Sequence, residues 1–179
     1  MIIVPVKASK DYDIVIGRGL LKNAGAYVRR VCDCETVMLV CGDIVEGLYA
    51  DMVQSSLEAA GYRVCRFVYP HGEQSKTART YFALLNALAE HGLTRADCIV
   101  ALGGGVTGDL AGFSAATYQR GISYVQMPTT LLAAVDSSVG GKTAIDLPAG
   151  KNLAGAFYQP SLVLCDYDTL NTLPEDVFT

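Results

Sequence analysis

The sequence predicts an α/β fold built on a mainly parallel sheet with helices on both faces. Short apolar runs that suit strands alternate along the chain with longer segments of helical periodicity. These runs are apolar along their whole length, as expected for strands that are covered on both faces. With 179 residues and 51% apolar side chains, the chain is long enough to bury such a core.

In the first half of the chain, strands are predicted at 13–17, 36–41 and 62–70, and helices at 44–61 and 75–92. Gly61 and Gly92 follow the two helices, where glycine commonly ends a helix, and the third strand ends at Pro70. Within the second helix, the apolar residues that repeat at helical spacing, and are therefore expected to face the core, are Ala78, Phe82, Leu85 and Ala89.

In the second half, a strand at 96–105 runs into three glycines and a helix is predicted at 106–118. A strand at 123–128, a short helix at 129–138 and a last strand at 161–167 follow. No element is predicted before residue 13 or between 139 and 160. The abrupt end after LNTLPEDVFT indicates a cut before a second domain.

Charge and hydropathy exclude several classes of function. The net charge is −4 and the sequence pI is about 5.1, which argues against a nucleic-acid partner. No apolar run reaches the ~18 residues that a membrane span needs. The N-terminus lacks a basic segment followed by a long apolar stretch, so no signal peptide is predicted and the expected compartment is the cytoplasm.

The six cysteines divide into two groups. Cys41, Cys65, Cys98 and Cys165 sit in apolar, strand-like runs, where free thiols are expected to be buried. Cys32 and Cys34 flank one residue and could hold a metal ion. The chain has no second such pair and only two histidines, so a complete zinc site within it is not expected.

A glycine-rich turn is the first candidate site. Gly103, Gly105 and Gly108 satisfy the G-x-G-x-x-G pattern between a predicted strand and a predicted helix. Such glycines let the backbone approach a pyrophosphate, and the helix N-terminus offers N–H groups to it. The usual acidic residue about 20 positions further on is missing, which weakens a standard dinucleotide-binding interpretation. A tight turn without a ligand is the alternative.

The sequence VDSSVGGKTAID, residues 135–146, superficially resembles the phosphate loop of an ATPase. That loop requires a glycine five positions before Gly141, where this chain has Asp136, so the interpretation fails. What remains is a set of polar residues able to bind phosphate, carboxylate or sugar hydroxyls: Arg120, Thr129, Thr130, Asp136, Ser137, Ser138, Lys142, Thr143, Lys151 and Asn152. Solvated loop charges are the alternative for these residues.

Several motifs in order resemble the N-terminal domain of the 3-dehydroquinate synthase family. They are YPHGEQSKT, LGGGVTGDLAGF, YQRG, MPTTLLAAVDSSVGGKT, GKNLAGAFYQP and TLNTLP. The resemblance runs from Val37 to Pro174 and is looser over residues 1–36. It implies that residues 1–179 form a single Rossmann-like NAD-binding domain, the N-terminal part of a two-domain enzyme whose helical C-terminal domain is absent.

The same resemblance implies an activity and its partners. Members of this family convert the sugar acid phosphate DAHP to 3-dehydroquinate and phosphate in the shikimate pathway, the route to aromatic amino acids. They use NAD and a divalent metal, usually zinc, and are commonly homodimers. The metal ligands, one Glu and two His, would lie beyond Thr179, so no metal ligand is expected in this chain and the isolated chain is expected to be inactive.

The resemblance also implies roles for individual residues. Asp136, Lys142 and Asn152 match substrate-binding positions, and Arg120 matches an arginine that reaches the substrate of the neighbouring subunit. The positions that match NAD contacts are Glu73, Lys76, Gly104, Gly105, Val106, Asp109, Thr129, Thr130, Lys151, Thr169, Leu170 and Thr172.

One cofactor position departs from the family pattern. The family has Asp-x-Asn after its second strand, where the Asp binds the adenosine ribose, and this chain has Gly42 and Ile44 there. Asp43 is the carboxylate that could replace it. Three alternatives stay open: a related sugar phosphate cyclase such as 2-deoxy-scyllo-inosose synthase, a metal-dependent polyol dehydrogenase, and a nucleotide-binding module without catalysis.

Overall fold

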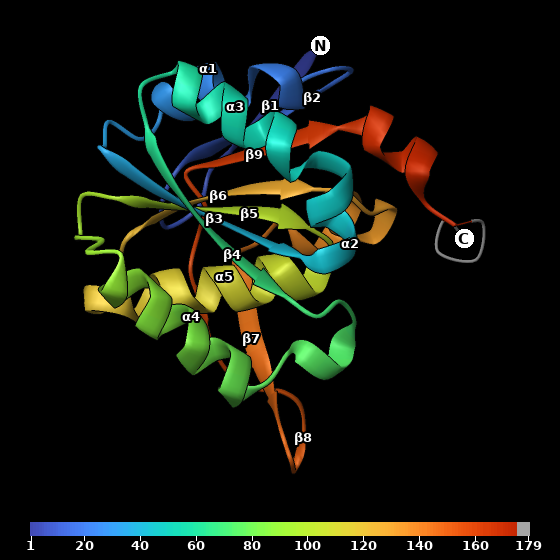
Figure 1. Ribbon diagram of the computed structural model, residues 1–179. Helices are drawn as coiled ribbons and strands as arrows, with labels where there is room; N and C mark the ends of the chain where they lie inside the picture. Colours follow the sequence, from blue (N-terminus) through green and yellow to red (C-terminus); the bar gives the residue numbers. More distant parts are fainter. Residues whose placement is uncertain (175–179) are drawn as a thin grey trace.

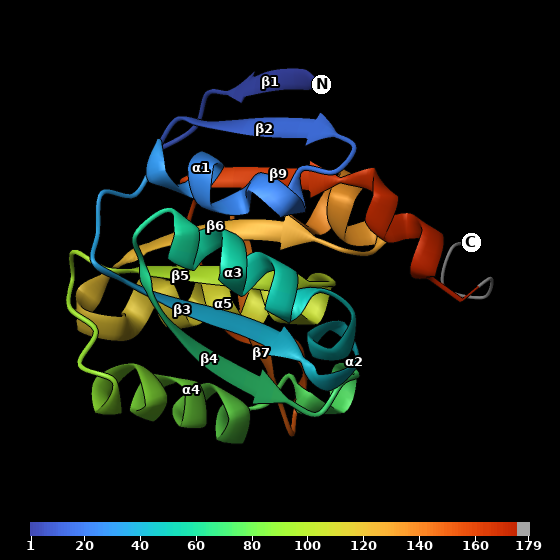
Figure 2. The same ribbon diagram turned by 45° about the horizontal axis from the view of Figure 1, so that its top comes forward.

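A seven-stranded sheet forms the centre of the molecule in the computed structural model, which describes residues 1–174. The strand order is β1-β2-β9-β6-β5-β3-β4, and every neighbouring pair is parallel except β1 and β2 (Figure 2). The bounds are β1 Ile2–Val6, β2 Tyr12–Gly17, β3 Thr36–Gly42, β4 Arg63–Tyr69, β5 Cys98–Gly103, β6 Ser123–Pro128 and β9 Leu162–Asp166. The predicted mainly parallel sheet is confirmed.

Helices cover both faces of this sheet, as predicted (Figure 1). α1 (Ala24–Arg29) and α3 (Asp51–Ala59) lie on one face, and α4 (Ala78–Glu90) and α5 (Gly105–Thr117) lie on the other. Alternate residues of β3 supply the two cores, with Val37 and Leu39 facing α1 and α3, and Met38 facing α4 and α5. Burial on both faces explains why this strand is apolar throughout.

A second, two-stranded sheet carries part of the candidate site. β7 (Lys142–Leu147) and β8 (Gly150–Phe157) form an antiparallel hairpin that packs against α5 (Figure 1). Gly155 permits this pairing, because a Cβ at that position would lie 2.0 Å from the carbonyl oxygen of Thr143. This hairpin holds residues 142 and 152 on adjacent strands.

The expectation that 139–160 and the segment before residue 13 lack elements is wrong. The hairpin occupies most of the first segment, β1 lies in the second, and the sequence also did not predict α1. Helix 44–61 starts at α2 (Asp43–Val45), passes through a π-helical turn at Glu46–Ala50 and continues as α3. The segment expected as a short helix at 129–138 is helical over 131–137, mostly as a π-helical turn.

The predicted core face of α4 is also wrong in part. Phe82 is 59% exposed and Ala89 is exposed, whereas the buried positions are Tyr81, Leu84 and Leu88. The glycine signals are confirmed: Gly61 (φ +89°) and Gly92 (φ +71°) both adopt the left-handed conformation just after a helix.

Candidate functional site

The candidate site lies where the parallel strands of the main sheet end. β3, β4, β5, β6 and β9 all run the same way, so the segments that follow them meet at one edge of the sheet. Ligands of open α/β sheets bind at that carboxyl edge. The predicted nucleotide-side residues 43, 73–76, 104–109, 129–130 and 169–172 directly follow these five strands.

The glycine turn joins β5 to α5. A side chain at Gly103 would clash with the start of α5, because a Cβ there would lie 2.2 Å from the Thr107 hydroxyl oxygen. Gly104 and Gly105 face the segment after β6, where added Cβ atoms would lie 3.1 Å from Thr130 and 3.2 Å from Ser137. Because the turn residues are glycines, no side chain of the turn covers the backbone N–H groups at the start of α5, a helix of 13 residues.

The two threonines after β6 hold this turn in place. The Thr129 N–H donates to the Gly103 carbonyl at 2.9 Å, which ties the end of β6 to the end of β5. The Thr130 hydroxyl accepts the Ala133 N–H at 3.3 Å and starts the helical segment that carries Asp136. Both threonines thus act structurally on the edge of the glycine turn.

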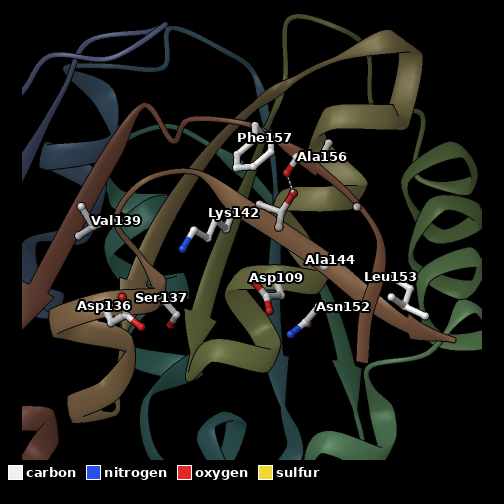
Figure 3. Close-up of a pocket in the computed structure, with 12 residues that line it drawn as sticks. Asp109, Asp136, Ser137, Val139, Lys142, Ala144, Asn152, Leu153, Ala156 and Phe157 are labelled. Carbon is white, nitrogen blue, oxygen red and sulfur yellow. Dashed lines mark hydrogen bonds between the residues drawn. The ribbon is translucent and has the colours of Figure 1, made fainter. Parts of the chain in front are cut away.

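A large cavity of about 470 Å³ lies between the hairpin, α5 and the segment 136–139. Figure 3 shows the carboxylates of Asp109 and Asp136, the ammonium of Lys142 and the amide of Asn152 around it. Sequence positions 109, 136, 142 and 152 were all predicted as site residues, and the structure brings them together in one cavity. Leu153 and Phe157 also line it and are largely exposed.

A largely buried ion pair, Lys76 and Asp109, together with the exposed Asn152 forms one wall of this cavity. Lys76 Nζ lies 2.5 Å from Asp109 Oδ2 and donates to Asn152 Oδ1 at 2.5 Å. The side chains of Lys76 and Asp109 are only 5% and 18% exposed. Burial raises the pKa of Asp109, and the hydrogen bond from Lys76 offsets part of that rise. Lys76 and Asp109 were both predicted as NAD contacts, and Asn152 was predicted as a substrate contact; the structure joins all three.

Asp146, which the sequence did not single out, fixes the geometry of Asn152. Asn152 adopts a left-handed backbone conformation with φ +57°, and its N–H donates to Asp146 Oδ1 at 2.8 Å. The Asp146 N–H in turn donates to the Lys76 carbonyl at 2.8 Å. The hairpin is thereby joined to the segment after β4. The available signal in the sequence was the turn-forming stretch Leu147-Pro148-Ala149-Gly150, which lies between Asp146 and Asn152.

Lys151 and Lys142 present positive charge at this edge. Lys151 Nζ lies 3.3 Å from Glu73 Oε1 in an exposed pair. Lys142 is exposed, and no salt bridge within residues 1–174 includes it. Its ammonium is available for an anionic ligand. Gly141-Lys142-Thr143 leads into β7 rather than into a helix, which agrees with the rejection of an ATPase phosphate loop.

Asp43 begins α2 directly after β3, close to the expected ribose position. Its Oδ1 accepts hydrogen bonds from the His71 N–H at 3.0 Å and the Ile44 N–H at 2.8 Å. The same oxygen lies 2.7 Å from His71 Nδ1, and this interaction lowers the pKa of Asp43. Half of the Asp43 side chain is exposed, so the carboxylate can still accept a ligand hydroxyl.

Thr169 and Thr172 lie in the 3-10 segment Tyr167–Thr172 after β9 and line a separate cavity of about 230 Å³. The Tyr49 hydroxyl contacts the Thr169 carbonyl and the Thr172 hydroxyl. Leu170 belongs to the same segment but lines neither cavity. This second cavity is on the same edge of the sheet as the first.

Of the four residues predicted to contact substrate, Arg120 is the one that does not line the large cavity. It is exposed, has φ +65°, and follows the end of α5 that is remote from the glycine turn. Among residues 1–174, no group of three or more His, Cys, Asp and Glu side chains could hold a metal ion. No helix in the described part of the chain is long and apolar enough to cross a membrane.

A family model described as 3-dehydroquinate synthase N-terminal matches residues 66–179 of the chain. The chain belongs to this family. A curated 3-dehydroquinate synthase from Geobacter metallireducens is 54% identical over 166 residues, which is 93% of the chain and 46% of that protein. The chain therefore spans about half the length of the curated relatives it matches.

Solved structures of two related enzymes share the fold. One is a 2-deoxy-scyllo-inosose synthase in complex with carbaglucose-6-phosphate, NAD+ and Co2+, with 29% identity and a TM-score of 0.84 over 97% of the chain and 47% of that protein. The other is a 2-epi-5-epi-valiolone synthase from Streptomyces hygroscopicus with NAD+ and Zn2+ bound, with 29% identity and a TM-score of 0.85 over 97% of the chain and 48% of that protein.

Proposed function

We propose that this chain is the nucleotide-binding half of a 3-dehydroquinate synthase, which converts DAHP to 3-dehydroquinate and phosphate. The observation that carries the proposal is the cavity lined by Asp109, Asp136, Lys142 and Asn152, in a chain 54% identical to a curated 3-dehydroquinate synthase. Residues 1–179 would be one α/β NAD-binding domain at the start of a longer two-domain enzyme. In the cell we expect a cytoplasmic homodimer of the shikimate pathway.

The residues at the edge of the sheet fit NAD. The N-terminus of α5 and the side-chain-free glycine turn suit a pyrophosphate, and Asp43 offers a carboxylate to a ribose. Asp109 would hold the nicotinamide edge of the cofactor next to the large cavity, and Lys76, which the resemblance places on the adenosine side, would be joined to it by their ion pair. NAD, when bound, supplies a hydride acceptor and donor for the substrate carbon.

The residues of the large cavity fit a sugar acid phosphate. The exposed ammonium of Lys142 would bind the phosphate or carboxylate, and the carboxylate of Asp136 would accept hydrogen bonds from hydroxyl groups. Asn152, held by Lys76 and Asp146, would orient a further hydroxyl. Positioning and charge neutralisation are the protein's contribution to such a reaction. Arg120 would act on the substrate of a neighbouring subunit.

The described residues do not fit the divalent metal that the family uses, because residues 1–174 contain no cluster of ligands for it. Its ligands would have to come from outside this part of the protein. Leu153 and Phe157, which line the large cavity, are exposed, and so are Leu132 and Val135 in the helical segment just before Asp136. We propose that the part of the relatives' length that this chain does not span packs there and completes the site.

Two other functions are less well supported. A 2-deoxy-scyllo-inosose synthase would use the same cavity, but the identity to a solved member is 29% against 54% to a curated 3-dehydroquinate synthase. A module that only binds nucleotide agrees with the absence of a metal site within residues 1–174. For the isolated chain we expect NAD binding without phosphate release from DAHP in the presence of zinc.

Isothermal titration of NAD into the chain, without metal, tests the nucleotide site. We expect saturable binding that Gly105→Val abolishes, because a side chain there would fill the space in front of Ser137. Gly47→Ala is the matched control, since a Cβ at Gly47 has no atom within 4 Å. Equal binding by wild type and the folded Gly105→Val variant would refute the site. If neither binds NAD, the titration is repeated with Gly42→Asp. Binding by that variant would show that the ribose contact was too weak, and no binding would show that the site needs the remaining half of the enzyme.

A further inference from the structure

A cluster of thiols and hydroxyls lies at the opposite edge of the sheet from the candidate site. Cys98 begins β5, Ser123 begins β6 and Ser161 directly precedes β9, so these residues mark the amino ends of three parallel strands. Cys32 reaches the same place from the connection between α1 and β3. The sulfur atoms of Cys32 and Cys98 lie 3.3 Å apart, although 66 positions separate them in sequence. The candidate site uses none of these residues.

The two thiols differ in access to solvent. Cys98 is fully buried, whereas Cys32 is 5% exposed on a connection whose neighbouring side chains, Val31 and Asp33, are exposed. A small oxidant can therefore reach Cys32 before it reaches Cys98. Cys32 is the residue that would react first, and Cys98 stands directly behind it.

The surroundings of Cys32 favour its thiolate. The hydrogen bond between Cys32 and Cys98 lowers the pKa of Cys32 by more than burial raises it, and the charge of Lys10 and the hydroxyls of Ser161 and Ser123 lower it further. Lys10 Nζ is fixed near the cluster by donating to the Ser161 hydroxyl at 2.7 Å. Redox-sensitive cysteines typically combine a stabilised thiolate with a second thiol beside it.

Cys34 does not share this arrangement, although it is only two residues from Cys32. Its thiol points to the Thr36 carbonyl at 3.5 Å, and burial raises its pKa to about 12. Cys34 therefore provides a matched control for Cys32: a thiol of similar burial on the same connection, without a thiol partner.

We propose that Cys32 and Cys98 form a peroxide-sensitive dithiol that closes to a disulfide. The Cys32 thiolate attacks hydrogen peroxide, so that an S–O bond forms, the O–O bond breaks and hydroxide leaves. The Cys98 sulfur then attacks the Cys32 sulfur, the S–O bond breaks, and the Cys98 proton leaves with the hydroxyl as water. In sum, two thiols and one peroxide give one disulfide and two waters. The sulfurs need to approach from 3.3 Å to ~2.05 Å.

Peptide mapping of the peroxide-treated chain under non-reducing conditions tests this proposal. Trypsin releases Cys32 in peptide 31–63 and Cys98 in peptide 96–120, and cleavage before Asp33 then separates Cys32 from Cys34. We expect a Cys32–Cys98 link, loss of two of the six titratable thiols, and recovery of both with dithiothreitol. Cys34→Ser should leave the link intact. Cys32→Ala should abolish the link, and this variant keeps the buried Cys98 in place.

Several outcomes would overturn the proposal. They are a folded chain whose Cys32 is oxidised without forming a link, a link from Cys32 to Cys34, a link between two chains, and retention of all six thiols at peroxide concentrations that oxidise a free cysteine peptide. Because the wild-type peptide map already distinguishes these outcomes, the proposal does not depend on Cys98→Ala folding.

Discussion

Lys76→Met tests whether the buried Lys76–Asp109 pair is a structural requirement of the candidate site. The substitution keeps an unbranched side chain of similar length but leaves the Asp109 carboxylate, 18% exposed, without its cation. It also removes the donor to Asn152. Breaking a buried ion pair by removing one partner costs about 3–5 kcal/mol, and the partial exposure of Asp109 places the expected loss near ~3 kcal/mol.

The loss should depend on pH in a defined direction. Burial already raises the pKa of Asp109, and removal of Lys76 removes the interaction that offsets the rise. A raised pKa means that the folded state binds the proton more tightly than the unfolded state, so the penalty for ionised Asp109 appears as pH rises through the folded pKa. Below that pKa the loss shrinks by ~1.4 kcal/mol for each pH unit, until Asp109 of the folded wild-type chain also protonates.

Urea and thermal unfolding at about pH 7 and about pH 5 measure this effect. A loss of ~3 kcal/mol corresponds to a fall in Tm of about 6–12 °C for a chain of this size. Lys151→Met is the matched control, because its pair with Glu73 is exposed and worth about 0–1 kcal/mol. The double variant Lys76→Met/Asp109→Asn should recover most of the loss. A loss no larger than that of Lys151→Met, or one that is equal at both pH values, would refute the reasoning.

Two further predictions concern the glycine turn and the ribose position. Gly103→Ala should destabilise the chain by about 1–3 kcal/mol in urea unfolding, because the new Cβ would lie 2.2 Å from Thr107 Oγ1 and 2.8 Å from Thr107 Cβ. A neutral variant would contradict the geometry. Asp43→Asn should lower Tm at neutral pH, because the hydrogen bond from His71 stabilises the ionised carboxylate and lowers the pKa of Asp43. The difference in Tm from wild type should shrink as pH falls below 3.8, the ordinary pKa of an aspartate, because this contribution disappears when the carboxylate protonates. A difference that stays constant across a thermal series from neutral to acid pH would count against this role for Asp43.

The parallel strands could be predicted from sequence because burial on both faces leaves a continuous apolar signature. In β3 and β5 every residue is buried, so no polar position interrupts the run. The same argument fails for α4, whose sequence ARTYFALLNALAE has apolar residues at most positions. Apolar spacing then fits more than one face, and the packing against α5 decides that Leu84 and Leu88 are buried and Phe82 is not.

α1 was missed because its sequence contains a residue that disfavours helices. Gly25 lies inside Ala24–Arg29, where glycine costs about 1 kcal/mol relative to alanine. The structure explains its presence: a Cβ at Gly25 would lie 2.0 Å from the Ser56 carbonyl oxygen, so only glycine lets α1 approach α3 this closely. A contact between two helices thus overrides local propensity, and local sequence alone does not contain that contact.

Part of the candidate site is formed by consecutive residues and could be predicted from sequence, and part joins distant segments and could not. The glycine turn is a strand–turn–helix feature within ten residues, and its place at the end of β5 follows from the sequence. The cluster of Lys76, Asp109 and Asn152 joins three segments, and it exists only because the β7–β8 hairpin returns residue 152 to the segment after β4. That return depends on Gly155, on the left-handed Asn152 and on the bond to Asp146. Matching motifs to a family could therefore name these residues individually. That the buried Lys76–Asp109 pair also holds Asn152 follows only from the three-dimensional arrangement.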